Sequence, residues 1–136
     1  MIERTLAVIK PDAVATGHIG DIITRIEHKK LWLSGMELQW WSTEKATEFY
    51  REHQGKPFFP GLLAHSTSGA CVAMVLAGED AISCWRDLMG ATDPKKAMPG
   101  TLRGLYGTKM PANAVHGSDS PESAAREIKL LFPDLA

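Results

Sequence analysis

The stretch Ala70-Cys-Val-Ala-Met-Val-Leu76 is the most continuous apolar run in the sequence. A short apolar run without polar alternation is typical of a strand that is buried on both faces of a sheet. A second run of this kind, Thr5-Leu-Ala-Val-Ile-Lys10, lies near the N-terminus. We therefore expect two central strands, with the rest of the chain packed around them.

Weaker patterns predict the outer elements. Met36–Trp40 alternates as a strand covered on one face does, and Ala114–His116 predicts a short fourth strand. Apolar residues at helical spacing predict helices at residues 19–26, 42–53, 62–64, 82–89 and 120–131. Because helices fall between the strands and one strand is half-exposed, we expect an α+β sandwich. It consists of a four-stranded, mainly antiparallel sheet covered by helices.

Length and composition describe an ordinary globular chain. A length of 136 residues predicts a single domain, 1–136, and a net charge of −1 gives no field that would attract nucleic acid or a membrane. Cys71 and Cys84 lie in apolar surroundings, which favours buried reduced thiols over a disulfide or a metal site. Glu3 and Arg4 interrupt any signal peptide, and no apolar run approaches the roughly 20 residues of a membrane span. We expect a cytoplasmic location.

A histidine at the end of the short fourth strand is the first candidate for chemistry. His116 is followed by Gly117 and by a helix start at Ser120, which can cap the helix ahead of Pro121. Glu127 lies on that helix and could fold back to orient the imidazole, which would free one ring nitrogen. Taken alone, however, a histidine in this place is more often structural.

Other candidates lie where the predicted elements end. Lys10 ends a buried strand, where a lysine is usually at the surface but can also meet a ligand beside the sheet. Phe58, in a breaker-rich connection, can be hydrophobic cover or a platform on which a base stacks. Thr92 and Arg103 lie in the long segment 89–112, and loops of this length are usually functional or disordered.

Seven spaced segments together resemble the nucleoside diphosphate kinase family over nearly the whole chain. They are Glu-Arg-Thr-Leu (3–6), Ile-Lys-Pro-Asp (9–12), Ile-Gly-Asp-Ile-Ile (19–23), Gly-Lys-Pro-Phe-Phe (55–59), Gly-Ala-Thr-Asp-Pro (90–94), Pro-Gly-Thr-Leu-Arg-Gly (99–104) and Asn-Ala-Val-His-Gly-Ser-Asp-Ser (113–120). The resemblance implies a ferredoxin-like fold with the first and third strands central. It also implies magnesium-dependent transfer of the γ-phosphate between nucleoside tri- and diphosphates.

The resemblance further implies a role for each site residue. His116 matches the nucleophile, which would carry the phosphate as phosphohistidine in a ping-pong reaction, and Glu127 with Ser118 would orient it. The implied nucleotide-binding residues are Lys10, Tyr50, Arg86, Thr92 and Arg103 for the phosphates, Lys10 and Asn113 for the ribose, and Phe58 with Leu62 nearby for the base. Stacking on Phe58 implies broad base specificity. Mg²⁺ would be held mainly by nucleotide phosphates and water.

Three residues that depart from the family pattern leave the oligomeric state undecided. Ala112, Leu105 and Ala70 stand where many members have arginine, aspartate and proline. Members form homo-oligomers, tetramers or hexamers built from a similar dimer, and either is compatible with this sequence. A non-catalytic nucleotide-binding or scaffolding protein of the same fold is the alternative function. A phosphocarrier fits less well, because the base and ribose positions are intact, and a specific nucleic-acid binder lacks a basic stripe.

Overall fold

A computed structural model of the chain describes residues 2–136 and places four antiparallel strands in one sheet. The strands are β1 (Ile2–Ile9), β2 (Trp32–Gln39), β3 (Cys71–Glu79) and β4 (Val115–Gly117). Their order across the sheet is β2-β3-β1-β4, and β1 pairs with both β3 and β4. The two apolar runs therefore form the central pair, as the sequence predicts.

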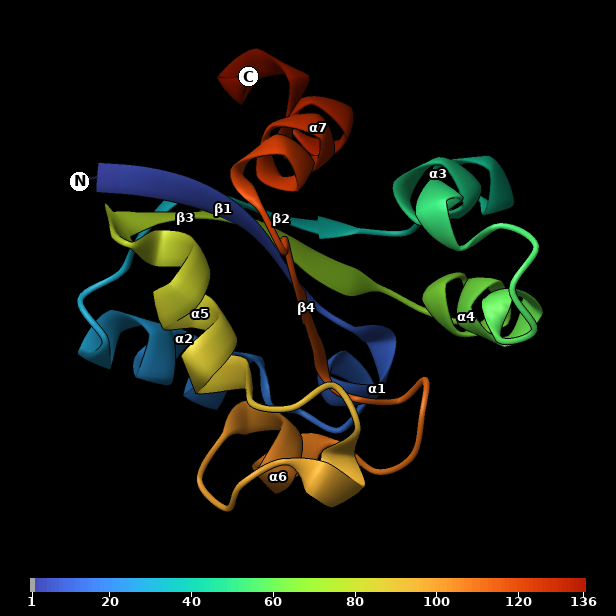
Figure 1. Cartoon of the computed structure of the whole chain (residues 1–136), viewed down its shortest axis with the longest axis horizontal. Coiled ribbons are helices and arrows are strands. Elements are labelled where there is room, and N and C mark those ends of the chain that lie inside the picture. Colours follow the sequence, from blue (N-terminus) through green and yellow to red (C-terminus); the bar gives the residue numbers. More distant parts are fainter. Residues whose placement is uncertain (1) are drawn as a thin grey trace.

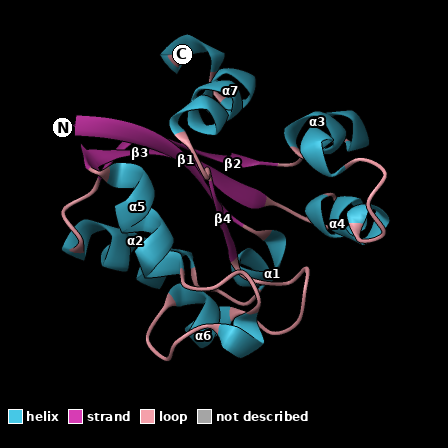
Figure 2. Cartoon of the chain, in the orientation of Figure 1, coloured by secondary structure: helices cyan, strands magenta, loops and turns pink. Residues whose placement is uncertain are grey.

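Helices cover both faces of this sheet. They are α1 (Pro11–Ala15), α2 (Ile19–His28), α3 (Thr43–Phe49), α4 (Phe59–Ser66), α5 (Ala81–Met89), α6 (Leu102–Tyr106) and α7 (Pro121–Leu131), with single 3₁₀ turns at Arg51–His53, Pro94–Lys96 and Pro133–Leu135. Figure 1 shows α2 and α5 on one side of the sheet and α3, α4 and α7 on the other, and Figure 2 shows the strands between these helices. The predicted α+β sandwich is confirmed.

Alternate residues of β1 supply the two halves of the core. Ala7 and Ile9 pack in a cluster with residues of α2 and α5, whereas Leu6 and Val8 pack with residues of α3, α4 and α7. All four side chains are buried, because successive residues of a strand point to opposite faces and both faces are covered. The sheet therefore lies between two apolar layers, and β4 pairs with β1 at one edge of the sheet.

Local signals set the helix starts that matter for the site. Ser42 Oγ accepts a hydrogen bond from the Lys45 backbone N–H at the start of α3. Ser120 Oγ accepts one from the Ser123 backbone N–H at the start of α7, and Pro121 occupies the first helical position. Within residues 2–136, no helix is both long and apolar enough to cross a bilayer.

Several boundaries differ from the predictions. Strand β2 begins at Trp32, whereas the sequence predicted a start at Met36. The early part was missed because the register shifts between Leu33 and Gly35, and this irregularity breaks the alternation of apolar and polar residues. Helix α3 ends at Phe49, so His53 lies in a separate 3₁₀ turn. Helix α1 follows β1 directly and was not predicted, since five residues are too few to show a helical period.

The long segment and one side-chain placement also differ. The segment 89–112 contains α6 and is therefore not structureless. Cys71 is buried as predicted, but Cys84 is only half-buried because α5 turns it toward the Lys29 carbonyl at the edge of the core. Of the two tryptophans that follow β2, Trp41 packs in the core and Trp40 is 70% exposed.

Candidate active site

His116 lies in β4, directly opposite Val8 of β1. Its Nε2 lies 3.0 Å from Glu127 Oε1, and Ser118 Oγ donates a hydrogen bond of 2.9 Å to the same carboxylate oxygen. Because a carboxylate oxygen accepts hydrogen bonds, this contact favours the tautomer in which Nε2 donates and Nδ1 carries the lone pair. The imidazole therefore has one nitrogen fixed by a buried carboxylate and the other available to a ligand.

The backbone and the ring of His116 are also held. Trp85 of α5 donates its indole N–H to the His116 carbonyl oxygen at 3.1 Å. A side chain at Gly117 would lie 2.5 Å from the Trp85 ring, so only glycine allows this close approach. The rings of Phe49 and Tyr50 meet the imidazole edge-on, at centroid distances of 4.8 Å and 5.7 Å. These contacts leave the ring little freedom to rotate.

A cleft of about 680 Å³ opens beside His116. Nine of the predicted site residues line it: Lys10, Tyr50, Phe58, Leu62, Arg86, Thr92, Arg103, Asn113 and His116. The other two, Ser118 and Glu127, do not line this cleft; they are buried against the histidine. The structure thus brings all eleven residues into one region from segments that lie far apart in the sequence.

Lys10 has an ammonium group at the floor of the cleft. Its Nζ donates to the Pro111 carbonyl at 2.7 Å and to Asn113 Oδ1 at 2.8 Å. Asn113 Nδ2 in turn donates to the Thr92 carbonyl at 3.0 Å. Burial lowers the pKa of Lys10 to about 8, although Asp12 nearby opposes this. A lysine that is costly to charge without a partner is well suited to receive an anion.

Two guanidinium groups add further positive charge. Arg103 of α6 is buried and donates to the carbonyls of Gly90 and Val115, at 3.1 Å and 2.9 Å. Its Nε has no hydrogen-bond partner among residues 2–136. Burial, and then the charge of Arg86, lowers the pKa of Arg103 to about 10. Arg86 of α5 lies exposed at the same cleft, so the wall beside His116 favours a ligand with several negative charges.

Part of the cleft lining is apolar. Phe58 is 53% exposed, Leu62 is buried and also lines the cleft, and Lys56 Nζ is 5.8 Å from the centre of the Phe58 ring. Met110, which the sequence reasoning missed, also lines the cleft and is exposed. A methionine in a loop rich in glycine and proline was the available signal.

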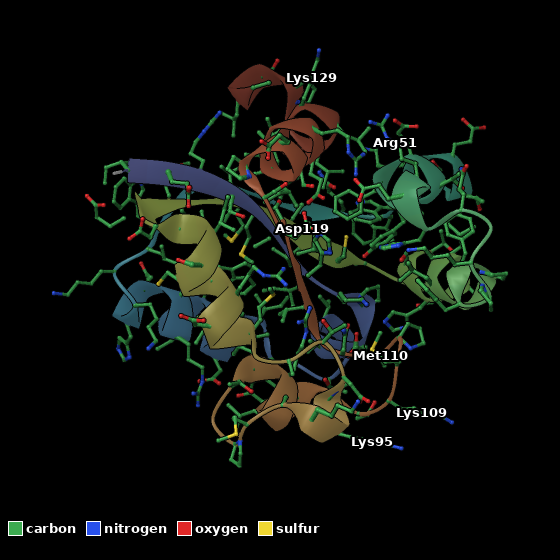
Figure 3. All side chains as sticks on the ribbon, in the orientation of Figure 1. Arg51, Lys95, Lys109, Met110, Asp119 and Lys129 are labelled. Atoms are coloured by element: carbon green, nitrogen blue, oxygen red, sulfur yellow. The ribbon has the colours of Figure 1, made fainter. Side chains whose placement is uncertain are left out.

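Two polar lining residues were missed as well. Asp119 and His53 both face the cleft near His116, and Figure 3 shows Asp119 near the start of α7. A hydrogen bond from Ser123 is the main cause of the lowered pKa of Asp119, which is therefore ionised at neutral pH. The short Ser-Asp-Ser run after His116 contained Asp119, but sequence alone did not show which of its side chains face the cleft.

The described residues do not form a metal site of their own. Over residues 2–136, no three or more His, Cys, Asp or Glu side chains cluster in a way that could hold an ion. A single carboxylate at the cleft, Asp119, can still contribute one oxygen to an ion that a ligand brings with it.

Comparison with known proteins gives the same family at the level of sequence. A family model described as nucleoside diphosphate kinase matches residues 3–136. A relative from Rhodococcus opacus (strain B4), named nucleoside diphosphate kinase, is 54% identical over 137 residues, covering 100% of this chain and 99% of the relative. One of the same name from Thermobifida fusca (strain YX) is 55% identical, covering 99% of this chain and 100% of the relative.

Solved structures agree in fold. The nucleoside diphosphate kinase of Aquifex aeolicus matches with a TM-score of 0.96 at 41% identity, covering 99% of this chain and 98% of that one. The halophilic nucleoside diphosphate kinase of Halobacterium salinarum, solved in complex with CDP, matches with a TM-score of 0.94 at 48% identity, covering 97% and 88%. The likeness confirms the predicted ferredoxin-like α/β sandwich.

Proposed function

The chain belongs to the nucleoside diphosphate kinase family, and we propose that His116 is the residue through which it moves phosphate. The protein is a phosphotransferase that takes the γ-phosphate of a nucleoside triphosphate and gives it to a nucleoside diphosphate. The observation that carries the proposal is the pairing of His116 Nε2 with the buried Glu127, beside a cleft with three cationic side chains.

The proposed transfer proceeds in two balanced halves. His116 Nδ1 uses its lone pair to form an N–P bond to the γ-phosphorus. The bond from that phosphorus to the bridging oxygen breaks, and its electron pair leaves with the nucleoside diphosphate. A second nucleoside diphosphate then attacks the phosphohistidine through its terminal oxygen and reverses these steps. One cleft therefore serves donor and acceptor in turn.

Glu127 gives the histidine its reactivity in this scheme. When Nδ1 forms a bond to phosphorus, the ring becomes positively charged, and a carboxylate 3.0 Å from Nε2 stabilises that charge. Ser118 donates to the same oxygen and keeps the carboxylate in place. Because the pair exists before any ligand binds, no rearrangement is needed when the charge develops.

The cationic side chains stabilise the phosphates. Phosphoryl transfer depends mainly on positioning and on charge spread over the phosphate oxygens. Arg86 and Arg103 come from two different helices and can contact these oxygens in a planar, bidentate manner, while Lys10 provides a point charge. We assign Thr92 and Tyr50 to neutral phosphate contacts at the same wall.

The remaining lining residues support binding of the nucleoside. Lys10 and Asn113 are already bonded to one another and can share a ribose hydroxyl. Phe58 offers an exposed aromatic side chain in the lining of the cleft, to which Leu62 also belongs. Every base has a flat face, so stacking without contacts to base edges supports broad base specificity.

The reaction uses a divalent cation with its nucleotide, and we propose Mg²⁺. We propose that phosphate oxygens and water hold this ion, since Mg²⁺ prefers oxygen ligands and usually keeps several waters. Asp119 is the carboxylate that faces the cleft and could hold one of those waters. When bound, Mg²⁺ neutralises part of the phosphate charge.

Several wider properties are proposals too. The chain acts on nucleotides, and we propose that it does so as a homo-oligomer, a tetramer or hexamer built from dimers. Exposed apolar side chains on β2 support this assembly.

We also propose that residues 1–136 form one domain, since the family model covers nearly all of them. For the location we propose the cytoplasm, where nucleotides are found. A purely nucleotide-binding or scaffolding role is not favoured, because the whole set of site residues is present.

Labelling with γ-³²P ATP and Mg²⁺, in the absence of an acceptor, tests the nucleophile. Wild-type protein should acquire acid-labile, alkali-stable label that added GDP discharges, whereas His116→Ala should acquire none. Binding of ADP by the variant should persist, because Lys10, Arg86 and Arg103 remain. Label of equal amount on His116→Ala would refute the assignment, and an unlabelled wild type that still binds ATP would favour the binding role.

A further inference from the structure

Ala114, two residues before His116, has an unusual backbone. Three non-glycine residues among 2–136 have a positive φ, namely Lys30, Asp80 and Ala114. The first two are exposed, but Ala114 has φ 73° and is fully buried. A left-handed conformation is sterically unfavourable for any residue with a Cβ, and alanine has no polar side chain to stabilise it. A hydrogen bond of 2.9 Å from the Val115 backbone N–H to the Asn113 carbonyl closes a tight turn around Ala114. Because a turn of this kind is strained, contacts from elsewhere in the chain must help to hold it.

The segment that follows β1 holds both polar backbone groups of Ala114. The Ala114 backbone N–H donates to Asp12 Oδ2 at 3.0 Å. The Ala114 carbonyl accepts from the backbone N–H of Lys10 at 2.8 Å. Figure 1 shows α1, which contains Asp12, beside the end of β4 where this contact is made. One peptide group on each side of the strained φ is therefore fixed by residues more than a hundred positions away in the sequence.

Asp12 is itself held from the other side. Its Oδ1 lies 2.9 Å from His65 Nε2 of α4, and the two side chains are 17% and 16% exposed. The two carboxylate oxygens of Asp12 therefore have different partners. Oδ1 contacts His65 of α4, and Oδ2 accepts the hydrogen bond from the Ala114 N–H. A short side chain with both oxygens engaged has one orientation, so the position of its bond to Ala114 is well defined.

We propose that Asp12 is a positioning residue, which holds Ala114 in its left-handed conformation and thereby sets the placement of Asn113 and His116 relative to each other. Asn113 lies immediately before Ala114 and contacts Lys10, and His116 lies two residues after it and contacts Glu127. A change of φ at Ala114 would rotate these two groups apart. Misplacement of reacting groups by about 1 Å is enough to slow a reaction roughly a hundredfold.

This inference rests on the proposed role of His116 and can fail separately from it. The measured quantity is the single-turnover rate constant for labelling of His116 by γ-³²P ATP, with the amplitude reporting the folded fraction. We expect Asp12→Ala to lower the rate constant at least roughly tenfold, as misplacement of this kind does. Asp12→Asn should stay within about threefold of wild type, since its amide oxygen can still accept from the Ala114 N–H.

Glycine at position 114 makes the test specific. Glycine adopts positive φ without steric strain, so Ala114→Gly alone should keep the wild-type rate constant, and Ala114→Gly added to Asp12→Ala should restore most of the lost rate. If Asp12→Ala does not fold, His65→Ala replaces it, because the His65 side chain contacts Asp12 Oδ1. We expect this variant to lose about threefold in rate and Ala114→Gly to restore it.

Asp21→Ala is the matched control. Asp21 also lies in the first turn of a helix and accepts hydrogen bonds from Arg25 and Tyr106, but it does not line the cleft. Asp21→Ala should be labelled at the wild-type rate whether residue 114 is alanine or glycine. An unchanged rate constant in Asp12→Ala, or an equal loss with alanine and glycine at 114, would overturn the inference. A wild type without label would instead overturn the role of His116.

Discussion

Lys10 is a buried cation whose pKa the fold moves toward the physiological range. Burial lowers its pKa from 10.5 to about 8, whereas a lysine in the unfolded chain titrates near its ordinary value. Between these pH values the unfolded state binds more protons than the folded state, so the free energy of unfolding rises with pH. Below about pH 8 both states are charged, and the buried ammonium opposes folding fully.

Comparing wild type with Lys10→Met at equilibrium tests whether the buried Lys10 makes the free energy of unfolding rise with pH. From about pH 8 to about pH 9.5, the unfolding free energy of wild type relative to the variant should rise by about 1–2 kcal/mol. Urea unfolding at a series of pH values measures the difference, which removes the contribution of groups that both proteins share. Lys129→Met, at an exposed position of α7, should show no such rise. A pH-independent difference for Lys10→Met would mean that burial does not shift its pKa.

At the scale of elements, the contact between β4 and α5 places the His116 backbone. A Cβ at Gly117 would lie 2.5 Å from Trp85 Cδ1 and 2.6 Å from Met89 Cε, both in buried side chains. Gly117→Ala must therefore push the indole away from the His116 carbonyl to which it donates. We expect a loss of about 1–3 kcal/mol in unfolding free energy, as for other overpacked cores, together with slower labelling of His116.

Gly20→Ala serves as the control for this substitution. A Cβ at Gly20 meets no atom within 4 Å, and Gly20 lies inside α2. Alanine there should leave labelling unchanged and stabilise the protein by up to about 1 kcal/mol, because glycine is unfavourable inside a helix. If Gly117→Ala behaved like Gly20→Ala in urea unfolding and labelling, α5 would not constrain β4.

Elements with a clear period were predictable from the sequence, and short or irregular ones were not. The apolar runs identified β1 and β3, and Ser120 with Pro121 identified the start of α7. The early part of β2 was missed because a register shift near Gly35 breaks its alternation, and α1 and α6 are too short for a period. Here the local signal is weak, and tertiary contacts decide the structure.

In the site, too, some features could be predicted from the sequence and others could not, but for a different reason. Local patterns made His116, Lys10 and Arg103 candidates, and the resemblance of their segments to a family gave them roles, although they come from different elements. The positive φ of Ala114 and its bond to Asp12 could not be predicted. Alanine gives no local sign of a left-handed conformation, and the contact joins residues on opposite ends of the chain.

At the scale of the whole molecule, β2 presents an open edge. It is the last strand on its side of the sheet, and Trp32, Met36 and Leu38 on it are 49%, 52% and 49% exposed. An edge strand offers unpaired N–H and C=O groups, and large apolar side chains on it favour pairing with another chain. We therefore expect two copies of this protein to meet through β2 in the proposed oligomer.

Substituting Leu38 by Asp should separate the subunits, because a carboxylate at a buried interface loses its hydration without gaining a partner. Light scattering after size exclusion should give a multiple of the single-chain mass for wild type and a smaller multiple for the variant. Lys129→Ala makes the same change in net charge at an exposed position of α7, labelled in Figure 3, and should keep the wild-type mass. The pairing of His116 with Glu127 and Ser118 lies within one chain, and we expect separated subunits still to be labelled at His116. A single-chain mass for wild type, or an unchanged mass for Leu38→Asp, would contradict assembly through this edge.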